Sequence, residues 1–322
     1  MNKSRPPRTR RNNPDRVLTS VSFVSSVAVI FLAALSLAGA QAPASRFVLA
    51  SVEDKDGDPV PGLTADDFVV HEGGAECETL NTSPAQYPVA ILMDTTQSAR
   101  QDFQQLRTAV RQFVDRLSGR EAALYTFGER AMKVVDFTRE VEKVRRAVDG
   151  LFAQPDAESH VLDAIIESAK NIQKREAPVS LIVAVSTGSN DQSSRTPREV
   201  LEAVMPSRSM IRVVEMRSPQ ASGRLTNPRG RRSSTSDRRA EAALGLEELL
   251  RALGERTRGR YDLVYSPSGY HTALDDLQRR LSAELFVEYL SCAGSGSASG
   301  LQLGTRLPGA TVRGIGLDRP PR

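Results

Sequence analysis

Apolar residues recur along this chain in two alternating patterns. Short continuous apolar runs, typical of strands buried on both faces, alternate with longer segments in which apolar residues return every three or four positions, as on one side of a helix. Within residues 100–118 this helical spacing is kept by Phe103, Leu106, Val110, Phe113, Val114 and Leu117. Strands that alternate with helices predict an α/β fold with a doubly wound, mainly parallel sheet and helices on both faces.

The elements predicted for this α/β unit fall within residues 85–290. Strands are expected at 87–93, 121–127, 131–137, 179–185, 210–216, 260–265 and 284–290. Helices are expected at 100–118, 139–149, 159–174, 240–256 and 272–282. The strand at 284–290 is expected to complete the unit.

A short β pattern precedes the unit, in residues 42–84. Apolar positions at 46–52 and 67–71 flank the turn-rich cluster 54–59, which predicts a hairpin. The cluster is acidic, but Pro59 and Ala65 stand where a calcium-binding EF-hand loop needs glycine and glutamate. We therefore interpret it as a solvated turn.

A second β pattern follows the unit, in residues 291–322. Strands are expected at 301–305 and 310–317, after a Gly- and Ser-rich stretch. Isolated hairpins are marginally stable in water, so the flanking segments are predicted to pack together as a small accessory β region.

The first 40 residues have the pattern of an export signal. A basic segment ends at Arg16, an apolar stretch runs from Val17 to Leu37, and Ala38-Gly39-Ala40 offers the small residues of a cleavage site. An uncleaved membrane anchor is the alternative, because the stretch approaches the roughly 20 residues that cross a bilayer. Either outcome predicts an exported protein, periplasmic or secreted.

Composition is that of an ordinary globular chain of about two domains. The sequence has 322 residues, 39% of them hydrophobic and 25% charged, with a formal net charge of +4. The export segment alone carries +5, so the remainder carries −1 and shows no general signal for binding nucleic acid.

The most distinctive chemistry follows the apolar run 89–93. Asp94 ends that run, and the hydroxyls of Thr96 and Ser98 follow at every second position. Magnesium prefers oxygen ligands and keeps several waters, so this set could hold Mg²⁺ and leave room for the carboxylate of a protein partner. The alternative is an ordinary strand followed by a capped helix, because Thr96 and Ser98 are also good N-caps.

Asp94-Thr95-Thr96-Gln97-Ser98 resembles the Asp-x-Ser-x-Ser metal-ion-dependent adhesion site of von Willebrand factor type A domains. The resemblance places Ser159 where the family has a threonine ligand, and Thr187 where it has the aspartate of a Thr-Asp-Gly motif. It implies a type A domain at about 85–290 and a metal site made of Asp94, Thr96, Ser98, Ser159 and Thr187. With one of two carboxylates missing, Mg²⁺ binding should be weak unless Asp191 turns into the site.

The segment Val60-Pro61-Gly62-Leu63-Thr64-Ala65-Asp66-Asp67-Phe68 resembles the upstream β segment of bacterial VWFA-related proteins, which also tend to end in a short β extension. This resemblance implies a non-enzymatic protein-binding module, acting in adhesion or as a scaffold. The alternative is a structural component of the cell envelope whose metal site no longer functions. The sequence lacks the G-x-S-x-G, Walker A and H-E-x-x-H patterns that several enzyme classes require.

Residues 217–239 form a polar segment rich in arginine, including Arg224, Arg229, Arg231 and Arg232. Such concentrated charge predicts contact with an acidic partner, an anionic glycan or lipid headgroups, and the alternative is a solvated insertion. Nucleic acid is not expected, because no aromatic residues interleave the arginines.

The chain has two cysteines, Cys77 and Cys292, one on each side of the α/β unit. In an exported protein such a pair predicts a disulfide, and two unrelated thiols are the alternative.

Overall fold

The computed structural model describes residues 44–117, 119–188, 191–217, 234–292, 300–317 and 320–321. Residues 41–322 form one compact unit. The predicted export signal, residues 1–40, lies outside the described residues. Within the described part of the chain, no helix combines the length and the apolar character needed to cross a bilayer.

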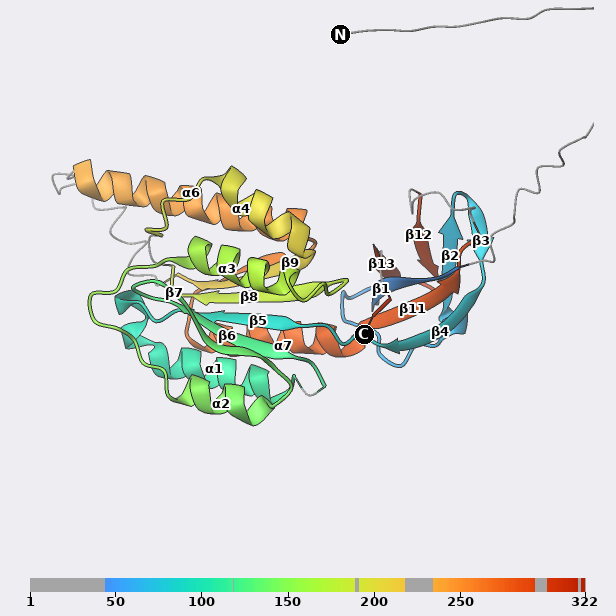
Figure 1. Ribbon diagram of the computed structural model, residues 1–322, viewed down its shortest axis with the longest axis horizontal. Coiled ribbons are helices and arrows are strands. Elements are labelled where there is room, and N and C mark those ends of the chain that lie inside the picture. Colours follow the sequence, from blue (N-terminus) through green and yellow to red (C-terminus); the bar gives the residue numbers. More distant parts are fainter. Residues whose placement is uncertain are drawn as a thin grey trace, which may run out of the picture. The chain divides into compact units, whose positions relative to one another are not determined.

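A six-stranded sheet forms the centre of the fold, with strand order β10-β9-β8-β5-β6-β7 (Figure 1). Its strands are β5 (Val89–Met93), β6 (Ala122–Phe127), β7 (Ala131–Thr138), β8 (Ser180–Ser186), β9 (Ser209–Met216) and β10 (Arg260–Val264). Every neighbouring pair is parallel except β6 and β7, which are antiparallel. The predicted mainly parallel sheet is confirmed.

Helices cover both faces of this central sheet (Figure 1). One face packs against α1 (Phe103–Asp115), α2 (Val141–Asp149) and α7 (Ser268–Ala283). The other packs against α3 (Val161–Gln173), α4 (Pro197–Val204) and α6 (Ser234–Arg256). Successive residues of a strand point to opposite faces, so Ile91 joins the first core and Leu92 the second.

Helix α4 was not predicted, although its start carries a clear signal. Thr196 and Glu199 form a capping box, in which the Glu199 carboxylate accepts from Thr196 N at 2.7 Å, and Pro197 occupies the first turn. The helix has only eight residues, and only Val200 and Val204 are buried, so the apolar period is too short to be recognised.

The flanking segments build two further sheets together. A four-stranded sheet has the order β13-β1-β11-β4, and a three-stranded sheet has the order β12-β2-β3. Their strands are β1 (Ser45–Glu53), β2 (Phe68–Glu72), β3 (Ala75–Cys77), β4 (Thr79–Pro84), β11 (Leu285–Leu290), β12 (Gln302–Thr305) and β13 (Thr311–Leu317). Because β13 pairs with β1 and β12 pairs with β2, the predicted accessory β region is confirmed.

The predicted hairpin between 46–52 and 67–71 is wrong. The turn itself is present, since Asp54 N donates to Asp58 O at 2.9 Å and Glu53 forms an isolated antiparallel β-bridge with Pro59. Both edges of β1 are already taken by β11 and β13, so the chain continues through a short 3-10 helix, Ala65–Asp67, and enters the other sheet as β2.

The prediction that the strand at 284–290 completes the α/β unit is also wrong. This strand, β11, pairs with β1 and β4 and belongs to the accessory region. Phe286 packs in the central core, whereas Val287 and Tyr289 pack in the accessory core. A strand that is apolar on both faces has the same sequence pattern in either sheet, and only the tertiary pairing separates the two cases.

Cys77, at the end of β3, and Cys292, just after β11, form a disulfide with a Cα–Cα distance of 5.3 Å. The bond closes a loop with a sequence separation of 215 and joins the two sheets of the accessory region. In the chain-entropy view, such a bond stabilises the protein mainly by restricting the unfolded chain.

Replacing both cysteines by alanine should lower the free energy of unfolding by up to about 5 kcal/mol, the chain-entropy value for a loop of this length. Guanidinium unfolding of the oxidised protein and of the double variant measures the difference. The chain has no other cysteine, so thiol titration of the unfolded oxidised protein reports on this bond alone. Two titratable thiols would contradict the disulfide.

Candidate functional site

The predicted site lies at the edge of the central sheet where β5 and β8 end side by side. The two strands are parallel neighbours, with Met93 opposite Val185, and Asp94 N donates to Val185 O at 3.1 Å. Ligands of open α/β sheets commonly bind at this carboxyl-terminal edge. The turn that begins at Asp94 therefore faces the turn that contains Thr187.

Asp94 is fully buried, and both of its carboxylate oxygens accept hydrogen bonds. Oδ1 accepts from Thr96 N at 2.8 Å and from Thr96 Oγ1 at 2.6 Å. Oδ2 accepts from Thr187 N at 2.8 Å and from Thr187 Oγ1 at 2.7 Å. Ser98 Oγ closes a ring of close polar contacts, 2.7 Å from Thr96 Oγ1 and 2.8 Å from Thr187 Oγ1. Because both threonine protons are donated to Asp94, the single Ser98 proton can be donated to only one of these two oxygens.

The ring joins four of the five predicted site residues, which we call the Asp94 ring: Asp94, Thr96, Ser98 and Thr187. The Thr96 hydroxyl bonds to Asp94 and not to a helix backbone N–H, although Thr96 precedes the 3-10 helix Gln97–Gln101. A carboxylate offers about four lone-pair directions, and four donors of this chain use them. The two turns are thereby locked together.

Ser159 lies on the loop beside the ring. This loop follows the Asp94 turn closely, because Gln154 N donates to Thr95 O at 2.8 Å and Gln97 N donates to Ala157 O at 2.9 Å. Ser159 is buried, and its Oγ has no hydrogen-bond partner among the described residues. The structure thus leaves one hydroxyl oxygen uncommitted and outside the ring.

Asp191 does not turn toward Asp94. Its Oδ1 accepts from Ser193 Oγ at 2.8 Å and from Leu162 N, in the first turn of α3, at 3.3 Å. Its Oδ2 accepts from Ser193 N at 3.1 Å, and burial raises its pKa. Asp191 is therefore committed to the start of α3 and does not supply the missing second carboxylate.

The residues of the site fit a hard divalent cation in ligand type but fall short in charge. Carboxylate and hydroxyl oxygens are the ligands that Mg²⁺ accepts, and the uncommitted Ser159 oxygen is one more. However, the ring holds a single carboxylate, and the Thr96 and Thr187 hydroxyls would have to turn away from Asp94 before it could face a cation. The affinity of this site for a divalent cation is therefore lower than that of a site with two free carboxylates.

Glu215 is a buried carboxylate near the site that the sequence analysis missed. It pairs with Ser186 across β9 and β8, and a Cβ added at Gly188 would lie 3.2 Å from Glu215 Oε1. Burial raises the pKa of Glu215, and Arg217 lies 3.6 Å away. The sequence signal that could have indicated this residue is an acidic side chain within the largely apolar strand 210–216.

Residues 89–190 match the family model of the von Willebrand factor type A domain. This part of the chain is a von Willebrand factor type A domain. A comparison with curated proteins found no match.

Several solved structures resemble the chain at low sequence identity. Protein BatB from Bacteroides thetaiotaomicron is 15% identical, with 60% of this chain and 98% of that chain covered and a TM-score of 0.45. A von Willebrand factor type A protein from Catenulispora acidiphila is 12% identical, with 87% and 74% covered and a TM-score of 0.46. Proximal thread matrix protein 1 from the mussel byssus, solved with a zinc-occupied adhesion site, is 12% identical, with 65% and 49% covered and a TM-score of 0.45.

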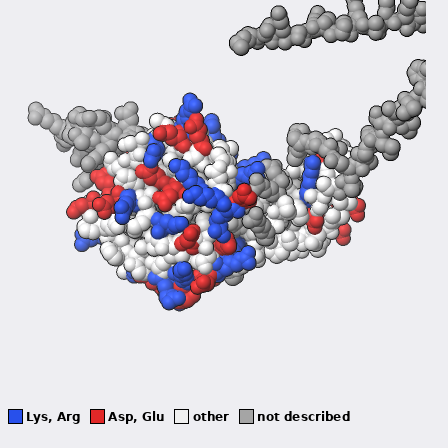
Figure 2. All heavy atoms as spheres, in the orientation of Figure 1, with Lys and Arg blue, Asp and Glu red and all other residues white. Residues whose placement is uncertain are grey.

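The predicted anionic-partner residues Arg224, Arg229, Arg231 and Arg232 lie outside the described residues. Arg217, which precedes them, forms ion pairs with Glu247 at 2.6 Å and with Glu215. On the face drawn in Figure 2, basic and acidic side chains are interspersed over the type A domain. That face presents no large patch of one sign.

Thr187→Val should lower the free energy of unfolding by about 1–3 kcal/mol, because it removes the hydroxyl that donates to buried Asp94. Ser159→Ala is the matched control, since it deletes a buried hydroxyl without a partner in the described structure and should leave stability unchanged or higher. Urea unfolding of both variants measures the difference. Equal losses for the two would contradict the ring.

Glu215→Gln should become more stable relative to the unchanged protein as pH rises above about 4.5, the ordinary pKa of glutamate. Because burial raises the folded-state pKa of Glu215, the charged carboxylate costs stability in that range. Glu247→Gln should show the opposite trend, since the hydrogen bond from Arg217 lowers the pKa of Glu247. Urea unfolding at pH 4, 5.5 and 7 compares the variants, and parallel pH profiles would contradict both assignments.

Proposed function

We propose that this chain is an exported, non-enzymatic protein-binding module, acting in adhesion or as a scaffold, that meets its partner at the Asp94 edge of the type A domain. The observation that carries the proposal is the ring of oxygen ligands at the carboxyl-terminal edge of the sheet. Ser98 and Gln97 are exposed beside buried Asp94, so a partner can reach this edge.

The partner would contribute an acidic side chain, with a weakly held divalent cation between the two proteins. Mg²⁺ keeps open positions for such a ligand when a protein supplies only part of its coordination. Asp94, Thr96, Ser98, Ser159 and Thr187 would hold the cation, with one negative charge among them. A second carboxylate from the partner would supply the charge that this site lacks, and binding of cation and partner would then be coupled.

Export is supported by the pattern of residues 1–40 and by the cysteine pair, because disulfides persist in oxidising compartments. We place the protein in the periplasm or outside the cell, held at the membrane if the signal stays uncleaved. Residues Arg224, Arg229, Arg231 and Arg232 would add a contact to an anionic glycan or lipid headgroup.

A second candidate function is a structural component of the cell envelope whose metal site no longer operates. The observation that favours it is the saturation of Asp94 by four donors from its own chain. In that case the Asp94 ring serves only to lock the two turns. Metal affinity separates the two candidates.

Thr187→Asp should strengthen Mg²⁺ and Mn²⁺ binding by roughly tenfold or more, because it restores a second anionic ligand. Calorimetric titration of the unchanged chain and of the variant measures the gain, and Asp94→Asn in the variant background should abolish it. Binding by the unchanged chain that is lost on Asp94→Asn supports the module. No heat from the unchanged chain together with a gain in the variant supports the structural candidate, and no gain from Thr187→Asp refutes the assignment of the site residues.

The location of the partner surface can be tested by crosslinking. A photoreactive residue introduced at exposed Gln97 should capture a protein from the exported fraction, and chelation of divalent cations should reduce the capture. The same residue at exposed Glu202, on α4, is the control position. Equal capture from both positions would contradict a binding surface at the Asp94 edge.

A further inference from the structure

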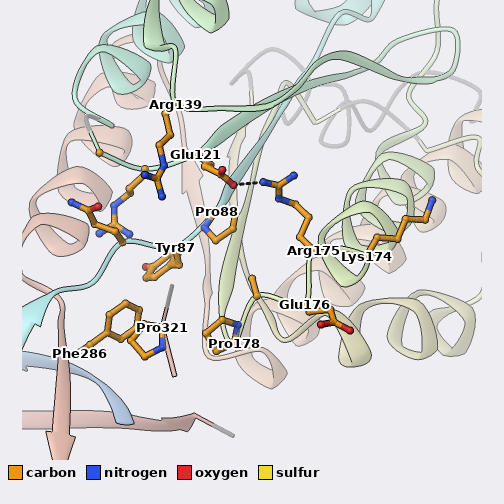
Figure 3. A pocket seen from close by; sticks show the side chains of 14 residues that line it. Tyr87, Pro88, Glu121, Arg139, Lys174, Arg175, Glu176, Pro178, Phe286 and Pro321 are labelled. Carbon is orange, nitrogen blue, oxygen red and sulfur yellow. Dashed lines mark hydrogen bonds and ion pairs between the residues drawn. The ribbon is translucent and has the colours of Figure 1, made fainter. Parts of the chain in front are cut away.

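A cavity of about 480 Å³, drawn in Figure 3, is lined by residues that precede strands of the central sheet, whereas the Asp94 ring lies where its strands end. Pro88, Glu121 and Pro178 line it, and each stands just before a strand of the sheet. Phe286 of β11 lines it from the accessory region. The cavity is therefore built where the type A domain meets the accessory strands.

The walls combine apolar and cationic groups. Tyr87, Pro88, Pro178, Phe286 and Pro321 supply apolar surface, and Figure 3 shows Pro321 beside Phe286, close to Tyr87. The cationic lining residues are Arg120, Arg139, Lys174 and Arg175, and the lining carboxylates are Glu121 and Glu176. Ligand sites are commonly concave and largely apolar with a few polar groups, and their volumes start at roughly 300 Å³.

Only part of this positive charge is neutralised within the protein. Arg175 forms an ion pair with Glu121 and stacks on Phe137 at 4.9 Å from the ring centre. Within the described part of the chain, Arg139 and Lys174 form no ion pair. Arg139 extends toward Tyr87 in Figure 3, so its charge faces the cavity.

Arg120 is a buried guanidinium on the cavity wall, with a relative exposure of 8%. Its Nη2 donates to Leu281 O at 2.7 Å, and the group stacks over Tyr87 at 4.5 Å. Its Nη1 is buried and has no hydrogen-bond partner among the described residues. A buried donor without a partner is costly, and charge-assisted hydrogen bonds from guanidinium to an oxyanion are strong.

Glu284 neutralises the positive charge of Arg120 only in part. Its carboxylate accepts a hydrogen bond from Tyr87 Oη, and burial raises its pKa, which favours the neutral form. The lining retains an excess of cationic groups over carboxylates. This excess of positive charge favours an anionic ligand.

We propose that this cavity binds a small organic anion, with a carboxylate directed at Arg139 and Arg120 and an apolar body against Tyr87, Phe286 and the prolines. The guanidinium groups of arginine match a carboxylate in shape as well as charge. The Tyr87 and Phe286 side chains offer ring surface for a planar body. This site is independent of the proposed function at the Asp94 ring.

Benzoate is a suitable probe, with benzyl alcohol as its uncharged analogue and inorganic phosphate as an anion without an apolar body. Benzoate titrated into the full chain should shift the amide signals of residues around Tyr87 and Phe286, and it should bind more tightly than either comparison compound. The variant Arg139→Gln should weaken benzoate binding by about tenfold, the loss of one charge-assisted hydrogen bond.

Arg130→Gln is the matched control, because Arg130 is an exposed arginine in the β6–β7 turn at the other end of the sheet, and this variant should bind benzoate normally. Equal binding of benzoate and benzyl alcohol would overturn the role of charge. Phosphate binding as tightly as benzoate would overturn the role of the apolar wall. Unchanged benzoate affinity in Arg139→Gln, or no shift near Tyr87 at millimolar benzoate, would overturn the site.

Discussion

The buried carboxylate of Asp94 is the constraint on which the carboxyl-terminal edge of the central sheet depends. An ionised group without solvent is costly unless it is hydrogen-bonded, and here Thr96 and Thr187 supply both backbone and hydroxyl donors. Those bonds tie the turn after β5 to the turn after β8. These four hydrogen bonds stabilise the Asp94 carboxylate in the interior. They also occupy the oxygen lone pairs that a cation would otherwise use.

This coupling shows what Thr187 contributes at the position where the resemblance expects a second aspartate. Where the family has a second aspartate, Thr187 brings a hydroxyl, and that hydroxyl turns inward to Asp94. A carboxylate at the same position could not donate to Asp94, and repulsion between the two charges would favour a cation between them. In this chain the Thr187 hydroxyl stabilises buried Asp94 through an internal hydrogen bond instead.

The accessory region depends on a different interaction, the pairing of chain segments far apart in the sequence. Strand β1 lies between β11 and β13, and the Cys77–Cys292 disulfide holds its two sheets together. Arg280 of α7 forms ion pairs with Asp276 and with Glu53 of β1, which joins the helix layer to this region. The cavity around Tyr87 exists because these two parts of the chain are packed against each other.

The amino-acid sequence by itself determined the α/β class, most of the elements and the set of ring residues, because strand and helix periods and a strand ending in Asp94 are local patterns. It did not determine the sheet to which β11 belongs, since Phe286 on one face and Val287 and Tyr289 on the other are apolar and fit either sheet. It also could not place the Thr187 hydroxyl against Asp94, turn Asp191 toward α3, or bring Arg120 and Arg139 to one cavity wall. These features depend on which distant segments meet and on where buried polar groups find partners, and only the tertiary structure decides that.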